Sequence, residues 1–142
     1  MQKVLIVEDD PLVADLLEEI LGEAGFEVCG VAGTVADAIE LGERHNPDLG
    51  VIDFRLSGGE YGMQVAAALR QNSRFGVLYA TGNPDHPLLS QAEGEGCIAK
   101  PYSAHTVVSA LRVVSEKMSN RPASALPRGF RLLVSPPAAQ AA

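Results

Sequence analysis

The chain has 142 residues, 46% of them apolar, which fits one compact domain of ordinary size. The sequence has no run of about 18 apolar residues and no secretory signal pattern at its start. We therefore expect a cytoplasmic protein with no membrane span. The two cysteines, Cys29 and Cys97, are too few for a disulfide scaffold, and both lie inside apolar runs.

Charge is distributed unevenly along the chain. Residues 1–118 hold all 18 acidic residues and 8 basic ones, a net charge of −10, whereas residues 119–142 hold three arginines and no acid. An acidic body is repelled by phosphate backbones, so direct nucleic-acid binding is not expected. We predict a folded domain over residues 1–118 and a basic tail rich in proline and alanine over residues 119–142, with no output domain.

The first predicted strand and helix meet at an acidic turn. Residues 3–7 are a run of branched apolar residues that ends abruptly at Glu8-Asp9-Asp10, as a buried strand does. From Pro11 to Gly25, apolar residues recur at the spacing of one helical face, with Asp10 as the N-cap. The apolar positions predicted to lie on this one face are Leu12, Val13, Leu16, Leu17, Ile20, Leu21 and Ala24.

The middle of the chain repeats the alternation of strand and helix. Residues 27–32 predict a second strand, followed by a helix that stops at Asn46-Pro47. Residues 49–52 predict a third strand, which ends at Asp53. A glycine-rich loop then leads to a helix over about residues 63–71.

The last two predicted strands also end in polar residues. Residues 76–80 predict a strand that ends at Thr81, and residues 96–99 predict a strand that ends at Lys100.

Two helices and a tail segment complete the prediction. Residues 84–93 indicate a short helix, and residues 103–118 indicate a final helix capped by Ser103. In the tail, residues 129–134 are an apolar run that indicates a short strand, a docking segment or a homodimer contact.

Five strands alternating with five helices predict a doubly wound α/β fold, because right-handed crossovers place helices over both faces of a parallel sheet. The expected arrangement is flavodoxin-like, with five strands in the order 2-1-3-4-5. In such a sheet the ligand site lies outside the carboxyl ends of the strands. The polar residues at those ends are therefore expected to form one site.

Three carboxylates, a hydroxyl and an amine meet at this predicted edge. Glu8, Asp9 and Asp53 repel one another unless a hard cation lies among them, and a few carboxylates with open water positions suit Mg²⁺. With Thr81 and Lys100 beside them, they predict a phosphoryl-transfer site. In this site an Asp53 oxygen attacks in line and becomes an aspartyl phosphate.

Over residues 3–118 the sequence resembles the receiver domain of two-component response regulators. The motifs that carry the resemblance are Val4-Leu5-Ile6-Val7-Glu8-Asp9-Asp10-Pro11, Val51-Ile52-Asp53, Ala80-Thr81-Gly82 and Lys100-Pro101-Tyr102. The resemblance implies that Asp53 is the phosphoacceptor, Asp9 a direct magnesium ligand and Glu8 a water-mediated one. It also implies that the Arg55 backbone carbonyl ligates the metal and that the Lys100-Pro101 peptide is cis.

The function implied by the resemblance is a signalling switch and not an enzyme. A histidine kinase or histidine phosphotransferase exchanges the phosphoryl group, and the phosphorylated domain acts on a downstream protein target. The run Tyr79-Ala80-Thr81-Gly82 is similar to a receiver subgroup marked by a Phe-Ala-Thr-Gly motif, whose members often stand alone. Tyr79 replaces the phenylalanine of that motif, and Asn83 replaces an apolar residue.

The sequence departs from the receiver pattern at two places. The position three residues before the lysine is usually aromatic and turns inward after the threonine moves, but here it is Cys97, so another element has to report phosphorylation. Ser57 stands where proline is frequent, and Gly58-Gly59 predict a freer loop.

Two alternatives remain open at this stage. Cys97 and Ser57 are also compatible with a degenerate receiver that binds partners without phosphorylation. A magnesium-dependent aspartyl phosphatase of the haloacid-dehalogenase type also uses a strand-end Asp, but it needs a second Asp two residues later, where this chain has Arg55.

Overall fold

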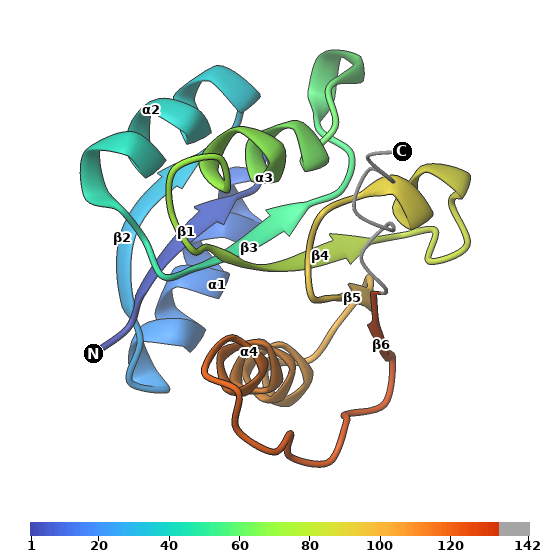
Figure 1. Cartoon of the computed structure of the whole chain (residues 1–142). Helices are drawn as coiled ribbons and strands as arrows, with labels where there is room; N and C mark the ends of the chain where they lie inside the picture. The colour runs from blue at the N-terminus through green and yellow to red at the C-terminus, as the bar shows by residue number, and fades with distance from the viewer. Residues whose placement is uncertain (134–142) are drawn as a thin grey trace, which may run out of the picture.

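A computed structural model of the chain describes residues 1–133. Its six strands form one sheet in the order β2-β1-β3-β4-β5-β6, with α2 and α3 on one face and α1 and α4 on the other (Figure 1). The strands are β1 (Lys3–Val7), β2 (Glu27–Ala32), β3 (Leu49–Asp53), β4 (Gly76–Thr81), β5 (Gly96–Ala99) and β6 (Phe130–Leu132). The α-helices are α1 (Pro11–Glu23), α2 (Val35–His45), α3 (Met63–Leu69) and α4 (Ala104–Met118).

The doubly wound α/β fold and the order of the first five strands are confirmed. All pairings among β1 to β5 are parallel. The prediction of five helices is wrong for residues 84–93, which hold only the 3-10 turn η2 (Pro87–Gln91). Leu89 is the only residue of η2 that is buried, so a longer helix here would have no apolar face to stabilise it.

The prediction of five strands also needs correction, because the tail adds a sixth. β6 pairs antiparallel with β5 and covers its outer edge, with Cys97 opposite Arg131. The Leu133 amide continues this pairing by donating to the Glu95 carbonyl at 3.0 Å. Of the predicted segment 129–134, Val134 lies outside the described residues.

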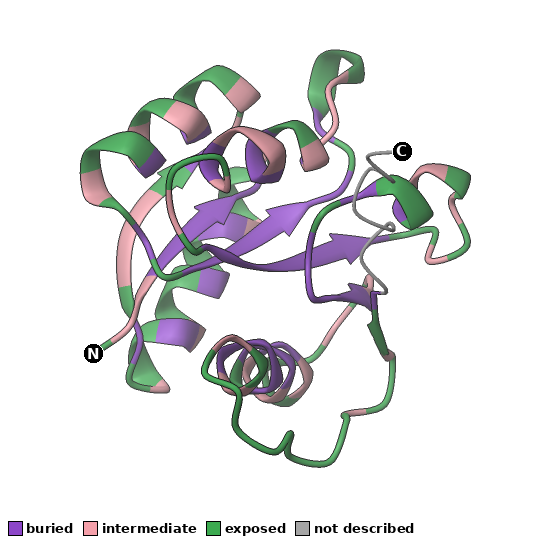
Figure 2. Ribbon diagram, in the orientation of Figure 1, coloured by how far each residue is buried: buried purple, intermediate pink, exposed green. Residues whose placement is uncertain are grey.

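Two apolar cores lie on the two faces of the sheet, and successive strand residues alternate between them. Leu5 and Val7 of β1 pack with the α2 and α3 side, whereas Val4 and Ile6 pack with the α1 and α4 side. Figure 2 shows β1, β3 and β4 buried between the helical layers. Since both faces are covered, the carboxyl ends of these strands are where the chain presents polar groups to solvent.

The predicted helix caps are confirmed, but the buried face of α1 is narrower than predicted. The Asp10 side chain accepts from the Leu12 amide at 3.0 Å. Leu12 and Leu16, however, are 79% and 58% exposed, whereas Leu17 and Leu21 are buried. The apolar stripe of α1 therefore extends beyond the surface that the sheet and α4 cover. Among residues 1–133 no helix has the length and apolarity needed to cross a membrane.

An ion pair with a buried carboxylate joins the residue after α3 to the residue before β5. Glu95 is 5% exposed, and its carboxylate accepts from the Arg70 guanidinium at 3.0 and 3.2 Å and from the Val77 amide at 2.8 Å. Removing only the cation leaves a buried carboxylate without its main partner.

We expect Arg70→Leu to lower the free energy of unfolding by about 2–3 kcal/mol, measured by urea denaturation. The matched control is Arg44→Leu, whose partner Glu40 forms an exposed pair one helical turn away, and the expected loss is below about 0.5 kcal/mol. Equal losses in the two variants would contradict this account of the Arg70 pair.

Candidate functional site

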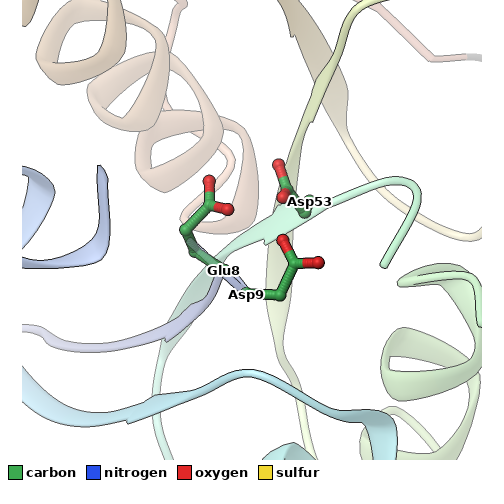
Figure 3. Close-up of side chains that lie close together, drawn as sticks. All are labelled: Glu8, Asp9 and Asp53. Carbon is green, nitrogen blue, oxygen red and sulfur yellow. The ribbon is translucent and has the colours of Figure 1, made fainter. Parts of the chain in front are cut away.

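The polar residues predicted at the strand ends meet at one edge of the sheet. Glu8 and Asp9 follow β1, and Asp53 is the last residue of β3. One carboxylate oxygen from each of the three lies within 4.8 Å of the others. Figure 3 shows these side chains gathered beside the ends of β1 and β3. Parallel strands explain the convergence, because their carboxyl ends point the same way.

The Lys100 ammonium reaches across the sheet to this group of carboxylates. Its Nζ lies 2.9 Å from an Asp53 oxygen and 3.6 Å from a Glu8 oxygen. Burial opposes the charged form of Lys100, but the hydrogen bond to Asp53 and the nearby carboxylates raise its pKa overall. Lys100 therefore stays protonated at neutral pH and provides a fixed positive charge beside Asp53.

The Glu8 carboxyl group has a strongly raised pKa, mainly because it is buried. Burial and the neighbouring Asp53 raise the pKa of Glu8 to about 7. The side chain also accepts from the Asp10 amide at 3.0 Å, which holds it in place at the end of β1.

Asp9 is held by a residue whose role the sequence reasoning missed. The Ser57 amide donates to Asp9 Oδ2 at 2.9 Å, and the Ser57 hydroxyl donates to the same oxygen. These hydrogen bonds lower the pKa of Asp9, so its side chain is ionised at neutral pH. The sequence contained one signal for this contact, a hydroxyl residue in the loop directly after the Asp53 strand.

The loop that carries Ser57 folds into a compact turn, and the freedom expected of its two glycines stays a prediction. Gly58 and Gly59 both have a positive φ, which glycine adopts without strain, and the Leu56 amide donates to the Glu60 carbonyl at 2.8 Å. The glycines thus allow the loop to close and bring Ser57 to Asp9.

Gly62 brings the start of α3 against the end of β3. A Cβ at Gly62 would lie 2.1 Å from the Asp53 carbonyl oxygen, so no larger residue fits this approach. The Gly62 amide donates to the Phe54 carbonyl at 2.8 Å. This packing fixes the position of the Asp53 backbone.

A surface cavity of about 260 Å³ lies over the Asp53 side chain. Asp53 is only 4% exposed, but it lines this cavity together with Thr81, Lys100 and Arg55. Its carboxylate is therefore open to a small group that enters from solvent. Thr81 lines the same cavity, and its hydroxyl accepts from the Asn83 amide at 3.0 Å.

Arg55 lines the same cavity and also contacts an aromatic side chain. It is exposed, and its guanidinium lies 5.7 Å from the centre of the Tyr61 ring. Its expected role as a metal ligand through the backbone carbonyl stays a prediction.

Two further expectations concern the strand that carries Lys100. The Lys100-Pro101 peptide is cis, as the resemblance implied. Cys97 is a free, buried thiol in the core, and the ladder between β5 and β6 pairs this residue with Arg131.

The model of the response regulator receiver domain family matches residues 4–112. The chain belongs to this family. In this receiver domain Glu8 and Asp9 follow β1, Asp53 ends β3 and Lys100 follows β5. These four residues converge in the structure.

Relatives of this receiver domain are response regulators of several kinds. It is 30% identical over 115 residues to the transcriptional regulatory protein PdtaR of Mycobacterium tuberculosis, with 79% of this chain and 56% of the relative covered. It is similar to the anti-anti-sigma factor PhyR of Bartonella quintana (26% identity, TM-score 0.66, 75% of this chain and 44% of that one). The chain is also similar to the signal receiver domain of a modulated diguanylate cyclase from Desulfovibrio desulfuricans, with 28% identity and a TM-score of 0.75. The match covers 84% of this chain and 98% of that one. The chain spans about half the length of the curated relatives it matches.

The donor set fits a magnesium ion. Glu8, Asp9 and Asp53 supply only oxygen ligands from a partly open site, which suits a hard cation that keeps several waters. The burial of Glu8 and Asp53 beside one another also favours a positive charge among them, beyond the one that Lys100 provides.

Proposed function

We propose that this receiver domain is a phosphorylation-controlled switch in which Asp53 accepts a phosphoryl group from a histidine kinase or histidine phosphotransferase. The observation that supports this most is the position of Asp53 on the floor of a surface cavity, 2.9 Å from the Lys100 ammonium and grouped with two further carboxylates. The switch then acts through contact with a downstream protein.

The proposed transfer follows from the positions of these groups. An Asp53 oxygen attacks the phosphorus atom of phosphohistidine in line, so that an O–P bond forms while the N–P bond breaks and imidazole leaves. Bound by Glu8, Asp9 and Asp53, Mg²⁺ would offset negative charge on the phosphoryl oxygens. Lys100 provides a second positive charge, and the Thr81 hydroxyl donates to a phosphoryl oxygen.

A neighbouring apolar groove offers a surface for the phosphodonor protein. The groove measures about 610 Å³ and lies between α1 and the segment that follows β5. Its lining includes Val13, Leu16, Ile20, Pro101, Tyr102 and Lys100. A donor histidine must reach Asp53 in line, so the donor has to dock beside the strand ends, where this groove lies. A contiguous apolar surface beside a reactive site is typical of an interaction surface.

The test compares the rate of phosphoryl transfer to Asp53 from a protein donor with the rate from a small-molecule donor. We expect Leu16→Gln to slow phosphoryl transfer from the cognate kinase, found in a panel of kinases, on the order of tenfold. Labelling by acetyl phosphate with Mg²⁺ should stay unchanged, because it needs only the cavity over Asp53. The control is Leu126→Gln, which changes another exposed leucine in the tail. Failure of every kinase and of acetyl phosphate to label the wild-type chain would refute the proposed function.

A further inference from the structure

The strand β6 is attached to the receiver domain by a small set of contacts. The chain leaves α4, passes around the outside of the domain and returns to the edge of β5 (Figure 1). Two hydrogen bonds flank the short ladder: the Ala99 amide donates to the Gly129 carbonyl at 3.2 Å, and the Leu133 amide donates to the Glu95 carbonyl at 3.0 Å.

The surface at the edge of β5 fits the side chains of β6 and of the residue that follows it. A Cβ at Gly96 would lie 2.5 Å from the Phe130 ring, so the absence of a side chain there allows the ring to pack closely. On the other face of the sheet, Leu133 is buried in the core that includes Cys97 and Tyr79. β6 is therefore held at a defined register by one apolar side chain on each face.

Arg131 links β6 to the loop that follows Thr81. One guanidinium nitrogen donates to the Pro84 carbonyl at 2.9 Å, and another lies 3.4 Å from an Asp85 oxygen. Both acceptors belong to a turn that hydrogen bonds connect to the phosphorylation site.

That turn is built on the Thr81 hydroxyl. The Asp85 amide donates to the Asn83 side-chain oxygen at 3.2 Å, and the Asn83 amide donates to Thr81 Oγ1 at 3.0 Å. Hydrogen bonds and the short chain thus run without interruption from the hydroxyl beside Asp53 to Arg131 on β6. The strand pairing places Arg131 opposite Cys97, the position where an aromatic switch residue is missing.

We propose that phosphorylation of Asp53 releases β6 from the β5 edge, with Arg131 as the residue that couples the two events. The proposal rests on the proposed function of Asp53. When the Thr81 hydroxyl turns to a phosphoryl oxygen, the turn from Asn83 to Asp85 shifts with it and its acceptors leave the guanidinium. β6 then keeps only its edge pairing and its two apolar side chains.

The contacts of Arg131 are weak enough for a switch. The side chains of Arg131 and Asp85 are 55% and 85% exposed, so water screens their attraction. An edge strand of three residues also opens at a small free-energy cost compared with the central strands. Loss of the Arg131 contacts can therefore change the population of docked β6 by several-fold.

The experiment uses hydrogen exchange in the full chain, with beryllium trifluoride and Mg²⁺ as a mimic of the phosphoryl group. The readouts are the amides of Ala99 and Leu133, which donate across the β5–β6 edge, and the reference is the Glu27 amide, which donates to the Gln2 carbonyl. We expect the mimic to speed exchange of the two β6-dependent amides about fivefold and to leave Glu27 unchanged.

Arg131→Gln removes the coupling residue and keeps a polar side chain on an exposed site. In this variant we expect fast exchange at Ala99 and Leu133 before the mimic is added, and little further change afterwards. Because coupling is reciprocal, the variant should also bind the mimic more tightly by a similar factor. Arg128→Gln, which changes another exposed arginine of the same tail, should behave like the wild type.

Two results distinguish a failure of the β6 release from a failure of the proposed function of Asp53. Binding of the mimic, seen as a bound fluorine resonance, with unchanged exchange at Ala99 and Leu133 overturns the release of β6 and leaves the function of Asp53 standing. Absence of the bound resonance in the wild-type chain refutes the proposed function and the release of β6 with it.

Discussion

We expect Asp53→Asn to abolish phosphorylation of the receiver domain by both a histidine kinase and acetyl phosphate. The amide keeps the size of the side chain and accepts a hydrogen bond from Lys100 in place of the carboxylate, so the fold should be retained. It lacks the anionic oxygen that forms the acyl phosphate. The measurement is incorporation of labelled phosphate in the presence of Mg²⁺, with loss of at least about a thousandfold in rate.

The matched control for this variant is Asp10→Asn. Asp10 lies in the same acidic turn, but its side chain caps α1, and asparagine is an equally good N-cap. Labelling of this control should match the wild type. Persistent labelling of Asp53→Asn at the wild-type rate would show that another residue accepts the phosphoryl group.

The second large effect concerns magnesium affinity. We expect Asp9→Asn to weaken Mg²⁺ binding on the order of a hundredfold, because it removes one of the few negative ligands from a site that binds through charge. Ser57→Ala, which removes a hydroxyl that holds Asp9 and keeps the amide hydrogen bond, should cost on the order of tenfold. Titration calorimetry of the two variants and of Asp10→Asn measures the order of these effects.

Two results would contradict the expected losses of magnesium affinity. Affinity that is unchanged in Asp9→Asn would contradict a magnesium site at these carboxylates. A larger loss in Ser57→Ala than in Asp9→Asn would mean that the Ser57 loop contributes more than its contacts with Asp9.

The site residues that could be predicted from the sequence are those at the carboxyl ends of the strands. Buried apolar strands can be identified from short runs of branched residues, and parallel pairing then brings their last residues together. For this reason Glu8, Asp53 and Lys100 could be placed in one site from sequence alone. Their separation along the chain did not matter, since all parallel strands end at the same edge of the sheet.

Features that depend on contacts between loops could not be predicted in this way. Ser57 and Asp9 are 48 residues apart, and neither periodicity nor spacing indicates their hydrogen bonds. The exposure of Leu16 was missed because an apolar stripe in a helix does not reveal how much of it the neighbouring elements cover. β6 was one of several interpretations of the tail, because pairing with β5 depends on the close fit of Phe130 against Gly96.

The most direct test of the central proposal identifies the phosphorylated atom. The receiver domain is incubated with a phosphodonor and Mg²⁺, and the acyl phosphate is then reduced with borohydride, which converts a phosphorylated aspartate to homoserine. Peptide mass spectrometry then locates the product. We predict homoserine at position 53, dependent on both Mg²⁺ and the phosphodonor. Incorporated phosphate with an unmodified Asp53, or homoserine at Asp9 instead, would contradict the proposed role of Asp53.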